Sequence, residues 1–112
     1  MVGHIYYISM PYSDFTKAKG RPVLVFKKID KNDFLILPLT SNLSREGIVI
    51  GEDDIKDGRL KKESVVIVPK LTAVDSSLLI GSRFIASLKK ESFSKVKHEI
   101  CLRLNCIDKR GI

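Results

Sequence analysis

The sequence is short of the residues from which many functional sites are built. It contains two cysteines, two histidines and no tryptophan. Cys101 and Cys106 stand five residues apart in an expected helix, where their side chains point in different directions, so we expect no intrachain disulfide. His4 and His98 are far apart and belong to no Cys-x-x-Cys or clustered-histidine pattern, which argues against a zinc site. We therefore predict that the protein uses no metal or other cofactor.

Long apolar runs are also missing. No stretch approaches the ~18 apolar residues of a membrane-spanning helix. The N-terminus has neither the charged segment nor the apolar run of a secretory signal. We expect no membrane association and a cytoplasmic location, and a reducing cytosol suits cysteines that are not paired.

What the chain does have is apolar residues for a core and an excess of positive charge. At 112 residues, of which 44% are apolar, it is expected to form one domain over residues 1–112. Its formal net charge is +7, which suggests a polyanionic partner such as RNA, DNA or an acidic protein segment. The alternative is a soluble protein that is simply basic, and charge alone does not decide between the two.

Hydrophobic periodicity predicts a mainly β fold that ends in a helix. The expected strands cover residues 4–10, 21–28, 34–40, 47–50, 64–68 and 80–88. Pro38 lies inside the third strand and suggests an edge or a bulge. From 89 to 105 the apolar period changes to three and four, which predicts an amphipathic helix packed on the sheet through Phe93, Val96, Ile100, Leu104 and Ile107. This pattern favours a small β-barrel or curled sheet with a C-terminal helix.

The hairpin formed by the second and third expected strands brings polar residues to its open end. Paired residue numbers in an antiparallel hairpin have a constant sum. A turn centred between Asp30 and Lys31 pairs Arg21 with Thr40, and a turn centred on Lys31 pairs Arg21 with Ser41. The polar segment 11–20 leaves from the same end, so this rim also receives further candidates. These are Ser13, Asp14, Lys17 and Lys19.

Such a rim suits phosphate chemistry. The guanidinium of Arg21 matches phosphate oxygens and stays charged, and a hydroxyl can hold another oxygen. RNA carries its own nucleophile, the 2′-OH, beside the phosphorus, so positioning and charge stabilisation can drive its cleavage without a metal. The alternative is that Arg21 forms a surface ion pair at a strand end. Asp14 is a candidate base, or simply the Asx-turn residue of its loop.

Taken in order, several segments resemble the MazF/PemK family of toxins from type II toxin–antitoxin systems. The segments are GHIY (3–6), PYSDF (11–15), KGRPVLV (19–25), LPLTS (37–41), LKKESVV (60–66) and KLTAVD (70–75), followed by the amphipathic helix. The resemblance covers nearly the whole chain. It implies an SH3-like β-barrel with a C-terminal helix, a homodimer, and a toxin-type endoribonuclease that cleaves single-stranded RNA without a metal. The products would be 2′,3′-cyclic phosphate and 5′-hydroxyl ends.

The resemblance also implies roles for single residues. Arg21 matches the arginine of the family's Arg-Pro segment and would stabilise the transition state, and Thr40 matches the threonine that holds the scissile phosphate. The expected RNA-binding residues are Ser13, Asp14, Lys17, Lys19, Ser41, Lys70 and Thr72. Where many members have Gln-x-Arg-Thr before Asp75, this chain has Lys70-Leu71-Thr72-Ala73, so no arginine transfers there. The expected partner is an acidic antitoxin protein.

Two other functions compete with this interpretation. One is a non-catalytic SH3-like barrel that binds nucleic acid or an acidic protein, which the missing arginine near Thr72 favours. The other is a toxin of related fold directed against gyrase, against which the Arg-Pro and Thr-Ser segments argue. The Arg21–Thr40 pair favours the endoribonuclease.

Overall fold

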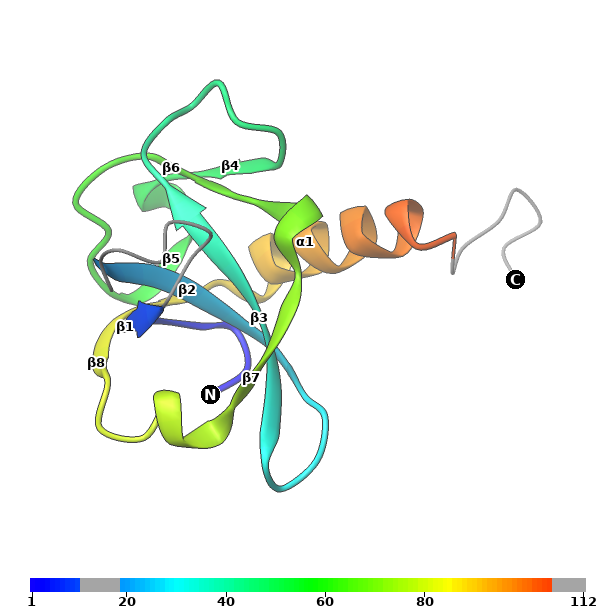
Figure 1. The fold of residues 1–112 in the computed structure, drawn as a ribbon. Coiled ribbons are helices and arrows are strands. Elements are labelled where there is room, and N and C mark those ends of the chain that lie inside the picture. Colours follow the sequence, from blue (N-terminus) through cyan, green and yellow to red (C-terminus); the bar gives the residue numbers. More distant parts are fainter. Residues whose placement is uncertain (11–18, 106–112) are drawn as a thin grey trace.

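The computed structural model of the protein describes residues 1–10 and 19–105 (Figure 1). Its strands are β1 (His4–Met10), β2 (Lys19–Lys28), β3 (Asp33–Thr40), β4 (Ile48–Ile50), β5 (Ile55–Gly58), β6 (Ser64–Val66), β7 (Thr72–Asp75) and β8 (Arg83–Leu88). Three short 3₁₀ turns and one α-helix complete it: η1 (Glu52–Asp54), η2 (Val68–Lys70), η3 (Ser76–Leu78) and α1 (Lys90–Arg103). The expectation of a mainly β chain with a C-terminal helix is confirmed.

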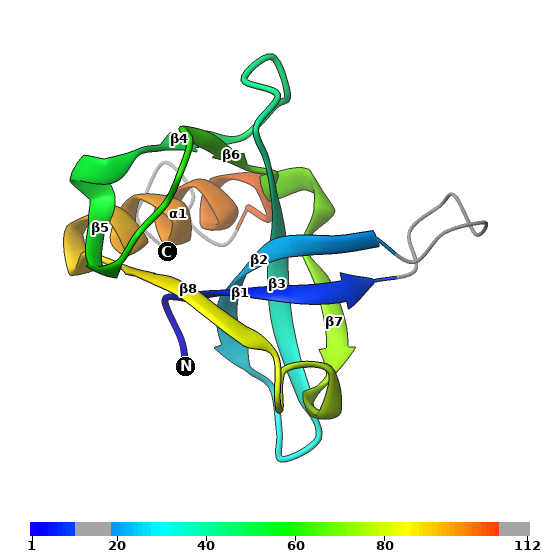
Figure 2. The same ribbon diagram turned by 90° about the vertical axis from the view of Figure 1, so that its left-hand side faces the viewer.

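All eight strands belong to one antiparallel sheet that curls into a half-barrel. The strand order is β4-β6-β3-β2-β1-β8-β5, and β7 pairs with β3 outside this path. β3 has two partners along one of its edges, because its first half pairs with β7 and its last two residues pair with β6. The sheet therefore bends around β3, and Figure 2 shows β1 crossing in front of it.

Each face of β1–β3 buries its own apolar cluster. One cluster lies between the sheet and α1 and includes Ile5, Leu24 and Leu37. The other includes Ile8, Val23, Ile36 and Val74, on the opposite face. Successive residues of a strand point to opposite faces, which explains why the runs of β2 and β3 are almost continuously apolar.

Helix α1 packs on the sheet through the predicted stripe. Val96 and Ile100 are buried in the core and Phe93 packs against it. The helix begins where the Asp54 carboxylate accepts hydrogen bonds from Ser92 Oγ at 2.7 Å and from Gly51 N at 2.9 Å. Partial burial by itself would raise the pKa of Asp54, but these hydrogen bonds and the nearby lysines hold it below its ordinary value. Leu104 follows the helix and is 64% exposed, and Ile107 lies outside the described residues.

Several boundaries differ from those expected. β5 and β7 lie in segments for which the sequence predicts no strand. Both are four residues long, and each exposes at least half of its side chains. β6 ends at Val66 because the chain turns into η2 at Pro69, whereas a strand to residue 68 was expected.

The expectation of an edge or bulge at Pro38 is wrong. β3 is central, and the bulge in its pairing with β2 lies between Val25 and Lys27. Pro38 O accepts from Ile67 N at 2.9 Å, so the backbone polar groups of Pro38 face away from β2. The backbone nitrogen of Pro38 therefore faces the junction between β7 and β6. Its lack of an N–H removes no hydrogen bond from the β2–β3 ladder.

In the part of the chain that the structure describes, no helix is long and apolar enough to cross a membrane.

Candidate nucleic-acid interface

The β2–β3 hairpin contains both registers that its sequence allows. Near the turn, Lys27 pairs with Leu35 and Lys28 with Phe34. The two residue numbers of each pair add up to 62, the register of a turn centred on Lys31. Beyond the bulge the paired residue numbers add up to 61, the register of a turn centred between Asp30 and Lys31. The ladder ends with Val23 opposite Pro38. Continued by two residues, this register sets Thr40, rather than Ser41, opposite Arg21 at the open end.

Arg21 and Thr40 lie on the same face of the sheet. Arg21 is half-buried in β2 and pairs with Ile8 of β1, a residue of the second apolar cluster. Thr40 is the last residue of β3, two positions after Pro38, and pairs with Val65 of β6. Because directly opposed residues share a face and positions two apart in a strand point the same way, both side chains belong to the face of Val23 and Ile36.

A chain of local hydrogen bonds orders the loop that follows Thr40. Thr40 Oγ1 accepts from Asn42 N at 3.2 Å, and Asn42 Oδ1 accepts from Ser44 N at 3.1 Å and from Ser44 Oγ at 2.7 Å. Because the Thr40 oxygen accepts from a backbone N–H, its own O–H is still available as a donor. A phosphate oxygen accepts hydrogen bonds, so it requires a donor of this kind.

The other predicted residues are spread more widely. Ser13, Asp14 and Lys17 lie outside the described residues, and of Lys19 only the backbone is described, as the partner of Met10. Ser41 is exposed directly after β3. Thr72 pairs with Ile36, on the Arg21 face but four residues from Thr40, or about 13 Å along the strand. Lys70 is exposed at the end of η2.

A groove lies on the other face at the same end of β2, and sequence reasoning did not find it. Its cavity volume is about 500 Å³. Pro22, Leu60 and Ile85 give it an apolar floor, and the 59–62 segment forms one wall. Arg59, Lys61, Lys62 and Arg83 supply cations, all of them exposed. The only signal in the sequence was the basic content of the connection that precedes β6.

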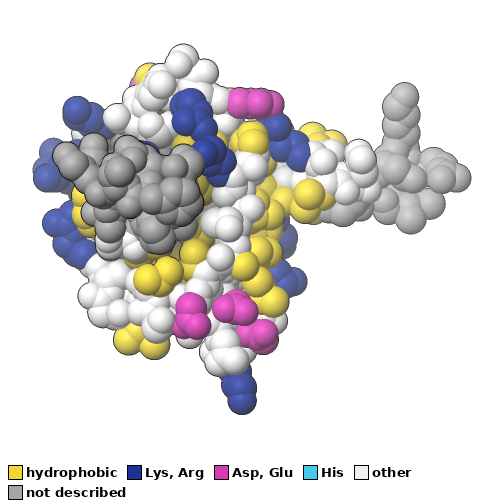
Figure 3. Space-filling view, in the orientation of Figure 1, with side chains coloured by type: hydrophobic (Ala, Val, Ile, Leu, Met, Phe, Trp, Pro, Cys, Tyr) yellow, Lys and Arg dark blue, Asp and Glu magenta, His cyan; other side chains and the backbone are white. Residues whose placement is uncertain are grey.

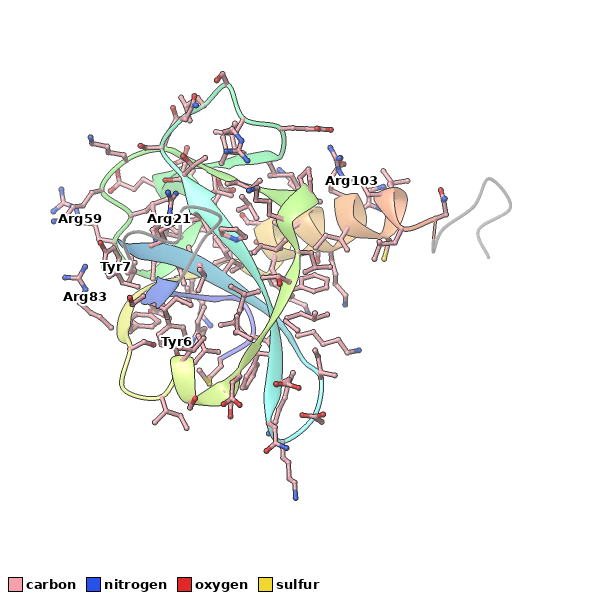
Figure 4. All side chains as sticks on the ribbon, in the orientation of Figure 1. Tyr6, Tyr7, Arg21, Arg59, Arg83 and Arg103 are labelled. Carbon is pink, nitrogen blue, oxygen red and sulfur yellow. The ribbon has the colours of Figure 1, made fainter. Side chains whose placement is uncertain are left out.

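The groove is assembled by strand pairing between distant segments. Tyr7 of β1 is the direct partner of Arg83 of β8, and the Arg83 guanidinium carbon lies 5.0 Å from the centre of the Tyr7 ring. Gly58 ends β5 with a φ of +81°, which turns the chain toward Arg59, and Arg59 N donates to Ile85 O at 3.2 Å. Figure 4 shows Arg21, Tyr7, Arg59 and Arg83 on one side of the molecule and Arg103 far from them.

Tyr7 also covers the start of β2. A Cβ on Gly20 would lie 2.1 Å from Tyr7 Cε1 and 2.8 Å from the phenol oxygen. Only glycine therefore lets the Tyr7 ring lie against this backbone, one residue before Arg21.

The closed end of the β2–β3 hairpin carries charges of both signs, because Lys27, Lys28 and Lys31 lie there beside three carboxylates. Asp30, Asp33 and Asp75 gather at the closed end, where Asp33 pairs with Asp75 and its backbone N–H donates to Asp30 Oδ1. Figure 3 shows acidic side chains at that end and Lys and Arg side chains on the flank near the open end. Within the described ranges, no carboxylate forms an ion pair with Arg59, Lys61, Lys62 or Arg83. The groove therefore concentrates positive charge that no ion pair among the described residues neutralises.

His4 does not belong to this site. It lies at the start of β1, four residues from Ile8, the partner of Arg21, and its ring packs edge-on against Phe84 at 5.5 Å. Burial, the N-terminal ammonium and Lys56 lower the pKa of His4, against an opposing effect of Asp57. Over residues 1–10 and 19–105, no three His, Cys, Asp or Glu side chains come together as a metal-binding cluster.

A scan of the sequence against protein-family models found no match, and a search of the curated proteins found no significant match. The resemblance to the MazF/PemK toxins therefore stays a prediction carried by the residues themselves.

Proposed function

We propose that this protein is a toxin-type endoribonuclease that cleaves single-stranded RNA, on an SH3-like barrel of the MazF/PemK kind. One observation carries the proposal: Arg21 and Thr40 each lie two residues beyond the last β2–β3 pair, Val23–Pro38, and belong to the same sheet face. If the ladder continued to these residues, their Cβ atoms would be about 4.5–5.5 Å apart. We therefore propose that one phosphate contacts both side chains.

The proposed reaction is an intramolecular transesterification. The 2′-oxygen attacks the adjacent phosphorus and the bond to the 5′-oxygen breaks. The 2′-OH loses a proton and the leaving oxygen gains one, so the products are a 2′,3′-cyclic phosphate and a 5′-hydroxyl and no water is consumed. Arg21 stabilises the charge that develops on the phosphate oxygens, and the ordered Thr40 hydroxyl donates to one of them.

Cleavage of a long single-stranded RNA in the presence of EDTA, with the cut ends mapped, tests this function. Wild-type protein should cut and leave cyclic phosphate ends. Arg21→Ala should lower the rate by roughly 10²–10³, because one charge-stabilising donor is lost. Arg21→Lys should recover only part of it, since an ammonium lacks the guanidinium fork.

Lys31→Ala is the matched control, because it removes one exposed cation at the closed end of the hairpin. The Arg21 variants must keep the circular dichroism spectrum of the wild type. A folded Arg21→Ala protein that cleaves at the wild-type rate would refute the assignment.

The groove favours a second candidate, a non-catalytic barrel that binds nucleic acid or an acidic protein. Its exposed cations and the ring of Tyr7 lie on the face opposite Arg21, and they could bind a ligand without any catalytic step. Protein that binds single-stranded RNA but leaves it uncut over a long incubation would support this candidate.

The proposal includes two partners, a second copy of the chain and an acidic antitoxin. A net charge of +7 favours an acidic segment that competes with RNA for the cationic face. Light scattering tests the homodimer, and a mass near 12.6 kDa at micromolar concentration would refute it.

A further inference from the structure

We infer that the groove beside Tyr7 is a stacking subsite for single-stranded nucleic acid, in which the Tyr7–Arg83 pair holds a base and the cations of the 59–62 segment hold the adjacent phosphates. The inference deepens the proposed function, because it assigns a second binding position for the nucleic-acid strand, away from Arg21. It rests on that proposal only for the identity of the strand as RNA.

The apolar floor suits a base rather than a phosphate. Pro22, Leu60 and Ile85 line it, and Leu60 and Ile85 continue into the core below. The cavity of about 500 Å³ falls within the range of pockets that bury a small ligand. Desolvating a phosphate on such a floor is unfavourable, whereas a base loses little there and gains dispersion contacts.

The Tyr7–Arg83 pair provides the stacking surface. Tyr7 is 42% exposed, and its contact with Arg83 presents a ring and a planar guanidinium together. Bases stack on both of these groups in proteins that bind single strands. Phe84 also lines the groove, but its ring is held edge-on against Tyr6 at 5.8 Å and against His4 at 5.5 Å, so the stacking role is assigned to Tyr7.

The rim of the groove then supplies the positive charge that phosphates require. Arg59, Lys61 and Lys62 are exposed along one short segment, and the described part of the chain offers them no ion-pair partner. Like charges held this close repel one another, so binding a polyanion relieves a cost that the free protein carries. Each phosphate that is bound also releases condensed counterions.

A nucleic acid fits these features better than an acidic peptide. Carboxylates would satisfy the cationic rim, but they would leave the apolar floor and the Tyr7 ring without a partner. A single strand satisfies all three, because each nucleotide carries a phosphate and a flat, apolar-faced base.

Fluorescence anisotropy with a labelled oligothymidylate of about ten nucleotides tests the inference. This DNA probe lacks the 2′-OH, so it measures binding whether or not the protein is a ribonuclease. A second probe has the same phosphates but abasic sugars, and a third is a polyglutamate peptide. Wild-type protein should bind the oligothymidylate at least tenfold more tightly than the abasic probe.

Variants separate stacking from charge. Tyr7→Leu should weaken binding of the oligothymidylate roughly five- to a hundredfold and leave the abasic probe almost unchanged, whereas Tyr7→Phe should behave as the wild type. Lys61→Ala should weaken both nucleic-acid probes equally and reduce the salt dependence by about one phosphate contact. Lys31→Ala, at the other end of the molecule, is the matched control.

Each outcome has one meaning. Equal affinity of the wild type for the base-bearing and abasic probes would overturn the inference, and so would wild-type affinity in Tyr7→Leu. If the polyglutamate peptide binds as tightly as the oligothymidylate, the groove is a site for acidic protein segments and the stacking role is wrong. If stacking is confirmed but RNA is never cut, only the endoribonuclease proposal fails.

Discussion

Replacing Gly20 by alanine should disturb the groove without unfolding the protein. The new Cβ would lie 2.1 Å from Tyr7 Cε1, whereas ordinary contacts begin at 3.4 Å, so the ring must retreat by about 1.3 Å. The clashing atoms form the far end of a side chain that is 42% exposed, so the ring has room to move. The move displaces it from the position in which it contacts Arg83 at 5.0 Å.

Two effects of this substitution on stability oppose each other. Gly20 does not have a positive φ, so alanine fits the backbone and restricts the unfolded chain, a gain of about 0.4–1 kcal/mol. Loss of an exposed cation–π contact costs about 0.5–1 kcal/mol. The free energy of unfolding in urea should therefore change by less than about 1 kcal/mol.

Binding should respond more strongly than stability. Because the base is proposed to stack on the Tyr7 ring in its present position, Gly20→Ala should weaken the oligothymidylate complex at least about fivefold. In a Tyr7→Leu background the same substitution should have no further effect, since the ring is already absent. Wild-type affinity in a folded Gly20→Ala protein, or an undiminished effect in the Tyr7→Leu background, would refute the reasoning.

Three further results are expected. Leu37→Ala should lower the free energy of unfolding by about 2–5 kcal/mol, measured by urea denaturation, because Leu37 is fully buried; a loss below 1 kcal/mol would contradict the described core. The pKa of Asp54 is lowered in the folded protein, so its stabilising effect is present above about pH 4, the unfolded value, and is lost as pH falls through the folded pKa. Ser92→Ala should cost about 1–2 kcal/mol at neutral pH, and less at pH 3, and a pH-independent cost would rule out the charged hydrogen bond. Replacing the ribose 5′ to an RNA cut by deoxyribose should abolish cleavage there, as assayed by gel electrophoresis, and continued cutting would indicate attack by water instead.

Local patterns in the sequence were sufficient for the long elements. Strands β1, β2 and β3 and helix α1 were predicted within a few residues, because each buries apolar side chains at its own period. The hairpin arithmetic left two registers open, with paired residue numbers adding up to 61 or 62, because the turn residues Asp30 to Asn32 are evident in the sequence but the bulge between Val25 and Lys27 is not. A site built within one hairpin, such as the Arg21–Thr40 pair, is therefore open to sequence reasoning.

The tertiary structure alone revealed the short strands and the groove. β5 and β7 are too short and too exposed to have a period, and they exist because β8 and β3 offer them unpaired backbone. Tyr7 and Arg83 face each other because β8 pairs with β1 across a bulge between Ile5 and Tyr6, and that register follows from closure of the curled sheet rather than from any local signal. The sequence by itself determined a mainly β fold, its terminal helix and the positive charge, since these depend on composition and short periods. The structure decided where that charge gathers, because contacts between residues distant in the chain depend on how the whole sheet bends.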